Sequence, residues 1–233
     1  MRHAIAGPVK AIVIGSSGGI GQALTSALRK RGAEVHPLSR RDGTIDLEDE
    51  GSIAAAADRL RPLGPFDLVI VATGVLHDPS LKPERSLRDL QGGQLARSFA
   101  VNAIGPALAA RHFLPLLPTQ ERGVFAALSA RVGSISDNRL GGWYGYRASK
   151  AALNQLIRTA AVELARMRPA AICVTLHPGT VDTAMSAPFQ RGVPPEKLFS
   201  PETAAGHLLA VLDGLTPQDS GLCFDWAGKP VPF

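Results

Sequence analysis

The stretch from Ala11 to Gly21 constrains this chain more than any other. It opens with a four-residue apolar run, Ala11 to Ile14, which is too short for a buried helix and therefore predicts a buried strand. A turn of glycine and serine follows, and helix-forming sequence continues directly from Gln22 to Arg31. A strand, a glycine turn and a helix N-terminus together form a phosphate-binding arrangement, because free backbone N–H groups and the helix dipole both favour an anion.

The glycines of this turn are spaced for that role. Gly15 permits the tight turn, Gly19 lets the backbone approach a pyrophosphate, and Gly21 allows close packing of the helix on the strand. We expect Ser17 and Ile20 to contact the same ligand. The spacing is Gly-x-x-x-Gly-x-Gly rather than the more general Gly-x-Gly-x-x-Gly. A purely structural turn between a strand and a helix is the alternative at this point, because glycine-rich turns are common.

Short apolar runs alternate with helical patterns along the chain. We predict strands at 11–14, 34–38, 44–47, 66–72, 123–128, 171–176 and 222–224. Helices are expected at 22–31, 52–60 with a serine cap, 87–117 with breaks near Gly92-Gly93 and Pro106, 143–167 and 201–215. Most strands are apolar throughout, which indicates a parallel sheet covered by helices on both faces. The 233 residues therefore predict one doubly wound α/β domain.

Composition excludes several classes of function. The net charge is +5, but the arginines are scattered and lack neighbouring aromatic residues, so we expect a small anionic ligand rather than nucleic acid. No window approaches twenty unbroken apolar residues, and the apolar part of residues 1–7 is too short for a secretory signal, so we expect no membrane span and no export. Six histidines show no metal-ligand spacing. Cys173 and Cys223 lie in apolar runs, which favours buried thiols in a reducing cytoplasm over a disulfide.

The distinctive polar and glycine residues gather in the turns that follow the predicted strands. In a doubly wound sheet, ligands bind across the carboxyl ends of the strands. The turns that would face this crevice are 15–21, 39–41, 73–74, 129–136 and 178–183. We therefore expect one site, built from segments that are far apart in the sequence.

Tyr146 and Lys150 are four residues apart in a helical run, so their side chains share one face. An isolated tyrosine has a pKa of about 10, which is too high for a general base at neutral pH. A nearby ammonium favours the phenolate and lowers that pKa. A tyrosine tuned in this way can give a proton to a carbonyl oxygen or take one from an alcohol.

These features together make the chain resemble the short-chain dehydrogenases/reductases over essentially its whole length. Gly15–Gly21 is similar to the family's glycine motif, and Tyr146 and Lys150 to its catalytic pair. Residues 101–105 resemble the segment that carries the active-site asparagine, and residues 176–183 the Pro-Gly segment that contacts the nicotinamide. The amino-acid sequence at residues 133–138 and 142–147 is similar to that of the C-factor-like and sniffer-type branch.

The resemblance implies a Rossmann fold, a nicotinamide cofactor and a homodimer or homotetramer joined through the helices at 87–117 and 143–167. It also implies that Lys150 holds the nicotinamide ribose and that Asn102 orders a proton-relay water. A substrate loop is expected at about 184–200. The implied cofactor contacts are Gly15, Ser17, Gly19, Ile20, Gly21, Asp46, Leu47, Gly74, Pro178, Gly179 and Thr183, with Asp46-Leu47 at the adenine.

The chain departs from the family pattern after two strands. Where the family has Asn-Asn-Ala-Gly, residues 71–74 read Val-Ala-Thr-Gly. Where it has Ser-Ser-x-x-Gly, Ala130 occupies the place of the serine that hydrogen-bonds the substrate carbonyl, and alanine cannot donate. Ser134 or Ser129 can supply the hydroxyl. We expect Ser134, which follows the strand and precedes Tyr146 by twelve residues; the alternative is that both serines merely hydrogen-bond the loop.

The end of the second predicted strand indicates which cofactor is preferred. A cofactor without a 2′-phosphate usually meets an acidic residue there, but residues 36–41 contain none. Ser39 and Arg40 instead offer a hydroxyl and a guanidinium, which suit a phosphate. We therefore predict NADP, with NAD possible; a solvated arginine pair is the alternative.

The sequence as a whole predicts an NADP-dependent oxidoreductase that interconverts a carbonyl and an alcohol, with Tyr146, Lys150, Asn102 and Ser134 as catalytic residues. The alternative is a nucleotide-sensing or signalling protein of the same fold with little or no turnover, which Ala130 favours. The residues name neither the substrate nor the physiological direction.

Overall fold

The computed structural model describes residues 9–233. Residues 1–7, on which the expectation of no secretory signal rests, lie outside the described residues. Six parallel strands form the central sheet in the order β2-β1-β3-β4-β5-β8. Their bounds are Glu34–Leu38, Lys10–Ile14, Leu68–Val71, Gly123–Leu128, Ala171–His177 and Cys223–Asp225. This confirms the predicted doubly wound α/β sheet.

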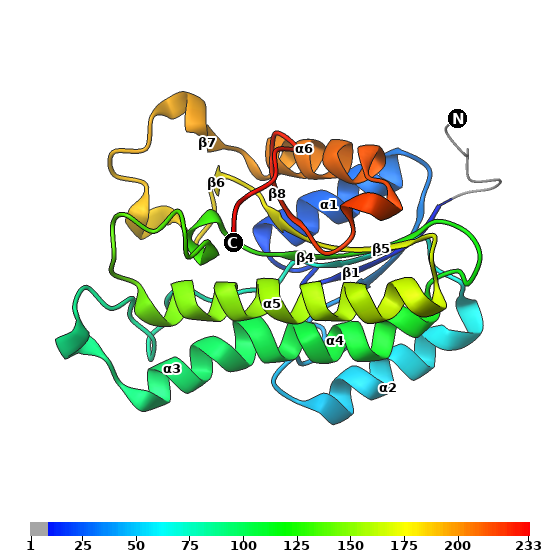
Figure 1. The fold of residues 1–233 in the computed structure, drawn as a ribbon, viewed down its shortest axis with the longest axis horizontal. Helices are drawn as coiled ribbons and strands as arrows, with labels where there is room; N and C mark the ends of the chain where they lie inside the picture. The colour runs from blue at the N-terminus through cyan, green and yellow to red at the C-terminus, as the bar shows by residue number, and fades with distance from the viewer. Residues whose placement is uncertain (1–8) are drawn as a thin grey trace.

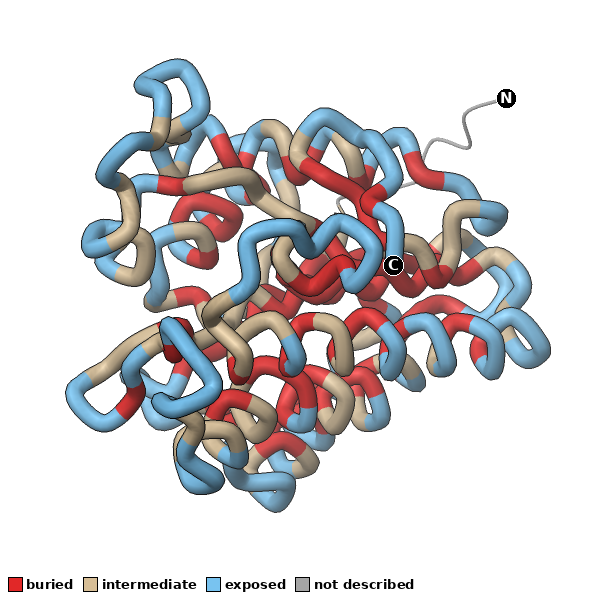
Figure 2. Tube along the Cα trace, turned by 60° about the vertical axis from the view of Figure 1, so that its left-hand side comes forward, coloured by how far each residue is buried: buried red, intermediate tan, exposed pale blue. Residues whose placement is uncertain are grey.

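Helices cover both faces of the sheet, as Figure 1 shows. One face carries α1 (Gly19–Lys30) and α6 (Pro201–Gly214). The other carries α2 (Glu50–Leu60), α4 (Gly105–Phe113) and α5 (Tyr144–Met167), and α3 (Gly92–Phe99) runs beside α5. The strands are the buried centre in Figure 2.

Alternating strand residues supply the two cores. In β1, Ile12 and Ile14 pack toward α2, α4 and α5, whereas Ala11 and Val13 pack toward α1 and α6. Because both faces are covered, these residues are apolar at every position instead of alternating with polar ones. This explains why short, unbroken apolar runs predicted the strands correctly.

The strand order reverses between β1 and β3: β1 pairs with β2 on one side and with β3 on the other, and β4 follows beyond β3. At such a reversal the connections leave in opposite directions, and a crevice opens at the carboxyl ends of the strands. The turn after Ile14, the turn after Val71 and the N-terminus of α1 meet there. The fold therefore places the glycine turn at the mouth of the crevice.

Three expectations for the elements were wrong in detail. Residues 44–47 form no strand: the N–H of Thr44 donates to the carbonyl oxygen of Ser39, and Ile45 and Leu47 are nevertheless buried. Helix α2 begins at Glu50, capped by Asp49, whose Oδ1 accepts from the N–H of Gly51. The predicted serine cap fails because Ser52 Oγ accepts instead from the N–H of Asp46.

The long helix expected at 87–117 is broken, as its glycines and proline suggested. A π-helical turn at Ala100–Ile104 separates α3 from α4. Short 3-10 turns occur at Arg61–Leu63, Leu87–Asp89, Leu114–Leu116, Arg131–Gly133, Ala187–Phe189, Pro195–Lys197 and Pro217–Asp219. Among residues 9–233, no helix is long and apolar enough to cross a membrane.

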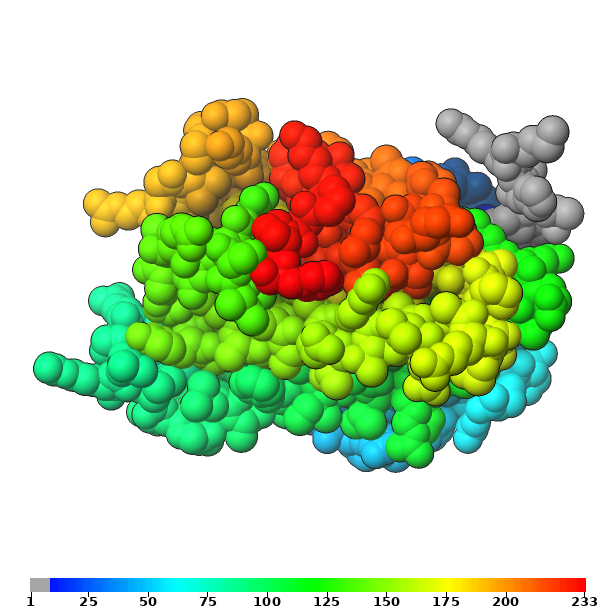
Figure 3. Space-filling view, in the orientation of Figure 1, coloured from blue at the N-terminus to red at the C-terminus, as the bar shows by residue number. Residues whose placement is uncertain are grey.

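The segment at 184–200 is mainly irregular and projects from one end of the molecule, where it lies beside the loop after β4 (Figure 3). Two short parallel strands that the sequence did not reveal, β6 (Thr180–Val181) and β7 (Leu198–Phe199), close its base. The N–H of Ser136 in the loop donates to the carbonyl oxygen of Phe233, so the C-terminal residues pack against the same loop.

We expect Gly21→Ala to lower the free energy of unfolding by about 2–3 kcal/mol, as overpacking does in a core. A Cβ at Gly21 would lie 2.1 Å from the carbonyl oxygen of Gly15, which is fixed backbone. Gly206→Ala in α6 is the matched control, because a Cβ there meets nothing within 4 Å and the alanine should stabilise the helix by about 1 kcal/mol. Urea unfolding measures the free energy of unfolding of both variants. Small, equal changes in the two would mean that the turn can relax to accept a Cβ at Gly21.

Candidate active site

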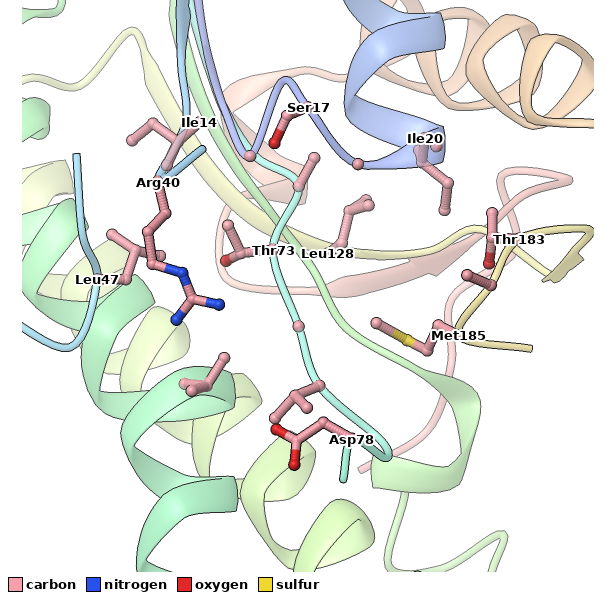
Figure 4. Close-up of a pocket in the computed structure, with 18 of the residues that line it drawn as sticks. Ile14, Ser17, Ile20, Arg40, Leu47, Thr73, Asp78, Leu128, Thr183 and Met185 are labelled. Atoms are coloured by element: carbon pink, nitrogen blue, oxygen red, sulfur yellow. The ribbon is translucent and has the colours of Figure 1, made fainter. Parts of the chain in front are cut away.

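A cavity of about 680 Å³ opens at the carboxyl ends of the central strands (Figure 4). Ser17 and Ile20 of the glycine turn line one side, Arg40 and Leu47 lie near the end of β2, and Thr183 and Met185 lie opposite them. Its volume falls within the range of about 300–1,000 Å³ that ligand sites occupy. The cavity is therefore large enough for a sizeable ligand.

The glycine turn has the geometry of a phosphate cradle. Gly15 has a φ of +87°, and its N–H donates to the carbonyl oxygen of Leu38 over 2.8 Å. Gly18 stands at the N-cap of α1 and has no side chain to cap the helix, so the first N–H groups of α1 remain available beside the cavity. A Cβ at Gly19 would approach the Thr183 methyl group to 2.8 Å. These residues fit an anionic group at the N-terminus of α1.

Tyr146 and Lys150 both line the cavity from the first turns of α5. The Lys150 Nζ donates to the carbonyl oxygen of Leu128 over 2.8 Å and lies 5.9 Å from the centroid of the Tyr146 ring. The helical spacing thus brings the predicted pair together. Lys150 is only 2% exposed, so its amine is held by protein rather than by water.

Burial shifts both pKa values in a direction that the sequence did not suggest. It lowers the pKa of Lys150 to about 7 and raises the pKa of Tyr146 to about 12. We expected a full ammonium on Lys150 to lower the tyrosine pKa. In the protein without ligand that effect is outweighed, because desolvation removes much of the positive charge that would produce it.

Asn102 lies in the π-helical turn between α3 and α4 and is fully buried. Its Oδ1 accepts from the N–H of Val75, and its Nδ2 donates to the carbonyl oxygen of Val75, both over 2.8 Å. The Nδ2 also donates to Ser149 Oγ over 3.2 Å. The side chain therefore ties the loop after β3 to α5. Asn102 does not itself line the cavity. Its position is nevertheless typical of a functional site, because π-helical turns are frequent there.

The two candidate serines lie in different places, and only Ser129 lines the cavity. Ser134 is 2% exposed, its Oγ accepts from the N–H of Asp137 over 3.1 Å, and it does not line the cavity. Ser129 lines the cavity, and its Oγ is buried without a hydrogen-bond partner within residues 9–233. The Oγ1 of Thr73 is in the same condition. Buried hydroxyls are normally paired, so these two mark places where a ligand would bind.

Arg40 points its guanidinium into the cavity (Figure 4), but Ser39 does not accompany it. Ser39 is 1% exposed, and its Oγ donates to Asp42 Oδ2 over 2.6 Å. Its hydroxyl therefore holds the turn after β2, and Ser39 does not line the cavity where we predict the cofactor to bind. Arg40 itself pairs with Glu48, at 3.1 Å.

Most of the predicted residues meet at this one cavity. Those that line it are Gly15, Ser17, Gly19, Ile20, Arg40, Asp46, Leu47, Gly74, Tyr146, Lys150, Pro178 and Thr183. Those that do not are Gly21, Ser39, Asn102, Ser134 and Gly179. Sequence reasoning missed Glu48 and Arg97, which face the cavity from the segment after Leu47 and from α3. Glu48 directly follows the Asp46-Leu47 pair, and that adjacency was the available signal.

A family model described as short chain dehydrogenase matches residues 41–193, more than half of the chain. The chain belongs to this family. A relative of this short-chain dehydrogenase, the C-signal of Myxococcus xanthus, is 39% identical over 171 residues, which cover 73% of the chain and 94% of the relative. The predicted family is confirmed, and the relative agrees with the predicted C-factor-like branch.

Solved structures share the fold of this short-chain dehydrogenase. The carbonyl reductase Sniffer of D. melanogaster superimposes with a TM-score of 0.80 at 20% identity, covering 97% of this chain and all of that one. An NADPH-bound carbonyl reductase from chicken fatty liver superimposes with a TM-score of 0.78 at 23% identity, covering 99% of this chain and 97% of that one. At these identities the similarity establishes the architecture.

We expect the stability of Lys150→Met relative to wild type to depend on pH. The Lys150 pKa is about 7 in the folded protein against 10.5 for an ordinary lysine, so between these values the unfolded chain binds one more proton. The wild type therefore gains about 1.4 kcal/mol per pH unit over this window. Lys150→Met lacks that gain, so its free energy of unfolding relative to that of the wild type should be highest below pH 7 and fall toward pH 10. Urea unfolding of both proteins at each pH gives the difference; a flat one would show that Lys150 titrates normally.

Proposed function

We propose that this short-chain dehydrogenase is an NADP-dependent oxidoreductase that interconverts a carbonyl and an alcohol, with Tyr146 as the general acid/base. One observation carries the proposal: the glycine turn, the Tyr146–Lys150 pair and the unpartnered Ser129 hydroxyl all line a single cavity. A phosphate cradle beside a proton donor suits chemistry on a nucleotide cofactor. NADPH binding by the chicken carbonyl reductase of the same fold also supports it.

The residues of the cavity fit the cofactor along its whole length. The N-terminus of α1 would hold the pyrophosphate, Arg40 the 2′-phosphate, and Asp46 and Leu47 the adenine. Pro178 and Thr183 would contact the nicotinamide end. When bound, the reduced nicotinamide supplies the hydride. NAD can use the same cavity without the phosphate contact.

Tyr146 is suited to give a proton to a carbonyl oxygen. With a pKa of about 12, its phenol is fully protonated at neutral pH, which favours the reductive direction. As the proton leaves, the phenolate favours the ammonium form of Lys150, whose pKa of about 7 keeps the amine and ammonium forms close in free energy at neutral pH. Asn102 would position the proton relay rather than contact the ligand, because its side chain ties the loop after β3 to α5 and does not line the cavity.

Ser129 takes the role that we first gave to Ser134. Its buried hydroxyl lies in the cavity wall, has no hydrogen-bond partner in the described part of the chain, and can donate to the substrate oxygen. Ala130, the next residue, leaves no other hydroxyl at the family's usual position.

An aromatic cluster lies next to Tyr146, outside the residues that line the cavity. Phe189 of the segment 184–200 packs edge-on against Trp143, with ring centroids 5.0 Å apart, and against His77, at 5.5 Å. Trp143 also contacts the Tyr146 ring at 6.3 Å. These rings favour a hydrophobic carbonyl compound over a highly charged one.

We also propose a homodimer or homotetramer in the cytoplasm. Leu156, Val162 and Met167 of α5 are large apolar side chains that are exposed, which suits a helix-to-helix interface between copies. Cys173 and Cys223 are both buried free thiols, which suits a reducing compartment.

We expect Tyr146→Phe to lower kcat/KM by about 10²–10⁴-fold while the Kd for NADPH stays within about twofold, because only the proton donor is lost. Ser129→Ala should lower kcat/KM by about a hundredfold, as loss of one oxyanion donor does. NADPH oxidation with a panel of aldehydes and ketones measures the rates, and fluorescence titration measures the Kd.

Ser134→Ala is the matched comparison for Ser129→Ala, because it removes the same hydroxyl from a residue outside the cavity. It should keep the wild-type rate within a few-fold. A larger loss in Ser134→Ala than in Ser129→Ala would restore the first assignment. A wild type that binds NADPH but reduces no member of the panel would favour the nucleotide-sensing alternative.

We expect Arg40→Ala to weaken NADPH binding by roughly ten- to hundredfold, since a charge-assisted contact contributes about 1.5–3 kcal/mol. NADH lacks the phosphate, so its Kd should barely change. Arg31→Ala, which removes the same charge from a pair with Asp213 outside the cavity, is the control. Equal losses for both cofactors would show that Arg40 is structural, and a wild type that prefers NADH would overturn the predicted preference.

A further inference from the structure

The adenosine end of the cavity holds a carboxylate that the cofactor assignment does not use. Glu48 lines the cavity and pairs with Arg40, with Nη1 and Oε1 3.1 Å apart. Its other oxygen, Oε2, lies 3.8 Å from Nη1 of Arg97, which reaches the same place from α3. Two guanidinium groups from distant parts of the chain thus converge on one carboxylate.

We propose that Glu48 is a specificity-determining residue that competes with the cofactor's 2′-phosphate for Arg40 and Arg97, an inference that rests on the proposed nicotinamide cofactor. An anion that takes the place of the carboxylate would meet both arginines at once. Glu48 thereby weakens the binding of NADP(H) selectively and narrows the difference in affinity between NADP(H) and NAD(H).

The two arginines differ in the ion pairs that remain when the Glu48 carboxylate moves away. Arg97 retains a second carboxylate, because its Nη2 lies 2.9 Å from Asp78 Oδ2. Within residues 9–233, Glu48 is the sole ion-pair partner of Arg40. Most of the competition should therefore act through Arg40, with Arg97 as the lesser contributor.

Electrostatics explains why a phosphate can displace Glu48 and why Glu48 still weakens its binding. A phosphate dianion binds a guanidinium more strongly than one carboxylate does, so it can displace Glu48. The displaced carboxylate nevertheless stays beside the phosphate and repels it, because Glu48 is fixed in the chain two residues after Asp46. A cofactor without the 2′-phosphate meets neither the competition nor the repulsion.

The decisive variant is Glu48→Gln, which keeps the size of the side chain and removes its charge. We expect NADPH to bind about five- to tenfold more tightly, in keeping with loss of one partly exposed ion pair and its repulsion. The Kd for NADH should stay within about twofold. Fluorescence titration of both reduced cofactors at about 50 mM salt provides a binding readout that does not depend on turnover, and higher salt should shrink the gain.

Two further variants isolate the mechanism. Glu50→Gln makes the same change two residues away, where the carboxylate pairs with Arg111 at 2.6 Å and does not line the cavity, so it controls for net charge. In the Arg40→Ala background, Glu48→Gln should give less than half of its gain. Thermal unfolding of each variant confirms that the fold is retained.

The outcomes separate this inference from the proposed function. Equal weakening of NADPH and NADH in Glu48→Gln would assign Glu48 to adenosine binding, and no change in either would show that it does not compete; both results overturn the inference. An equal gain in NADPH affinity in Glu50→Gln would show that net charge alone causes the effect, and this result would also overturn the inference. A wild type that binds neither cofactor would reject the proposed function as well. A wild type that prefers NADH, with a selective NADPH gain in Glu48→Gln, would reject the preference alone.

Discussion

The contact between Gly21 and the carbonyl oxygen of Gly15 determines where helix α1 can lie. No side chain fits between them, since a Cβ would come within 2.1 Å of that oxygen. This close approach lets α1 start beside the end of β1 and directs its N-terminal N–H groups into the crevice. The phosphate cradle is therefore a consequence of how helix and strand pack, and the rest of the site is arranged around it.

Buried polar groups divide this site into scaffold and working parts. Asn102 satisfies both backbone groups of Val75, and Lys150 donates to Leu128, so each fixes a neighbouring segment. The hydroxyls of Ser129 and Thr73 are buried in the same wall and have no hydrogen-bond partner among residues 9–233. Because an unpaired buried hydroxyl costs free energy, we expect one where a bound ligand supplies the missing hydrogen bond. This distinction separates Ser129 from Ser134 more clearly than sequence position does.

Burial also governs the chemistry of the Tyr146–Lys150 pair. Desolvation holds the phenol protonated and brings the amine close to half-charged at neutral pH. Neither group carries a fixed charge before ligand binds, and a change in one favours a change in the other. At the opposite end of the cavity, Arg40 and Glu48 form a partly exposed ion pair, so we expect ligand binding there to depend on exchange of that ion pair.

The sequence by itself determined the doubly wound sheet, the glycine turn and the helical pair Tyr146–Lys150, because each depends on local spacing: apolar runs, glycine positions and a four-residue step. It also indicated Arg40 as a residue of the cavity, since residues 36–41 contain no acid. Only the tertiary structure decided which serine faces the cavity, that Ser39 turns inward to Asp42, and that Glu48 meets Arg97. It also reversed the expected tyrosine pKa shift. Apart from the Ser39–Asp42 hydrogen bond, which lies within a single turn, these features depend on packing and desolvation by segments that are distant in the sequence, and they leave no local pattern.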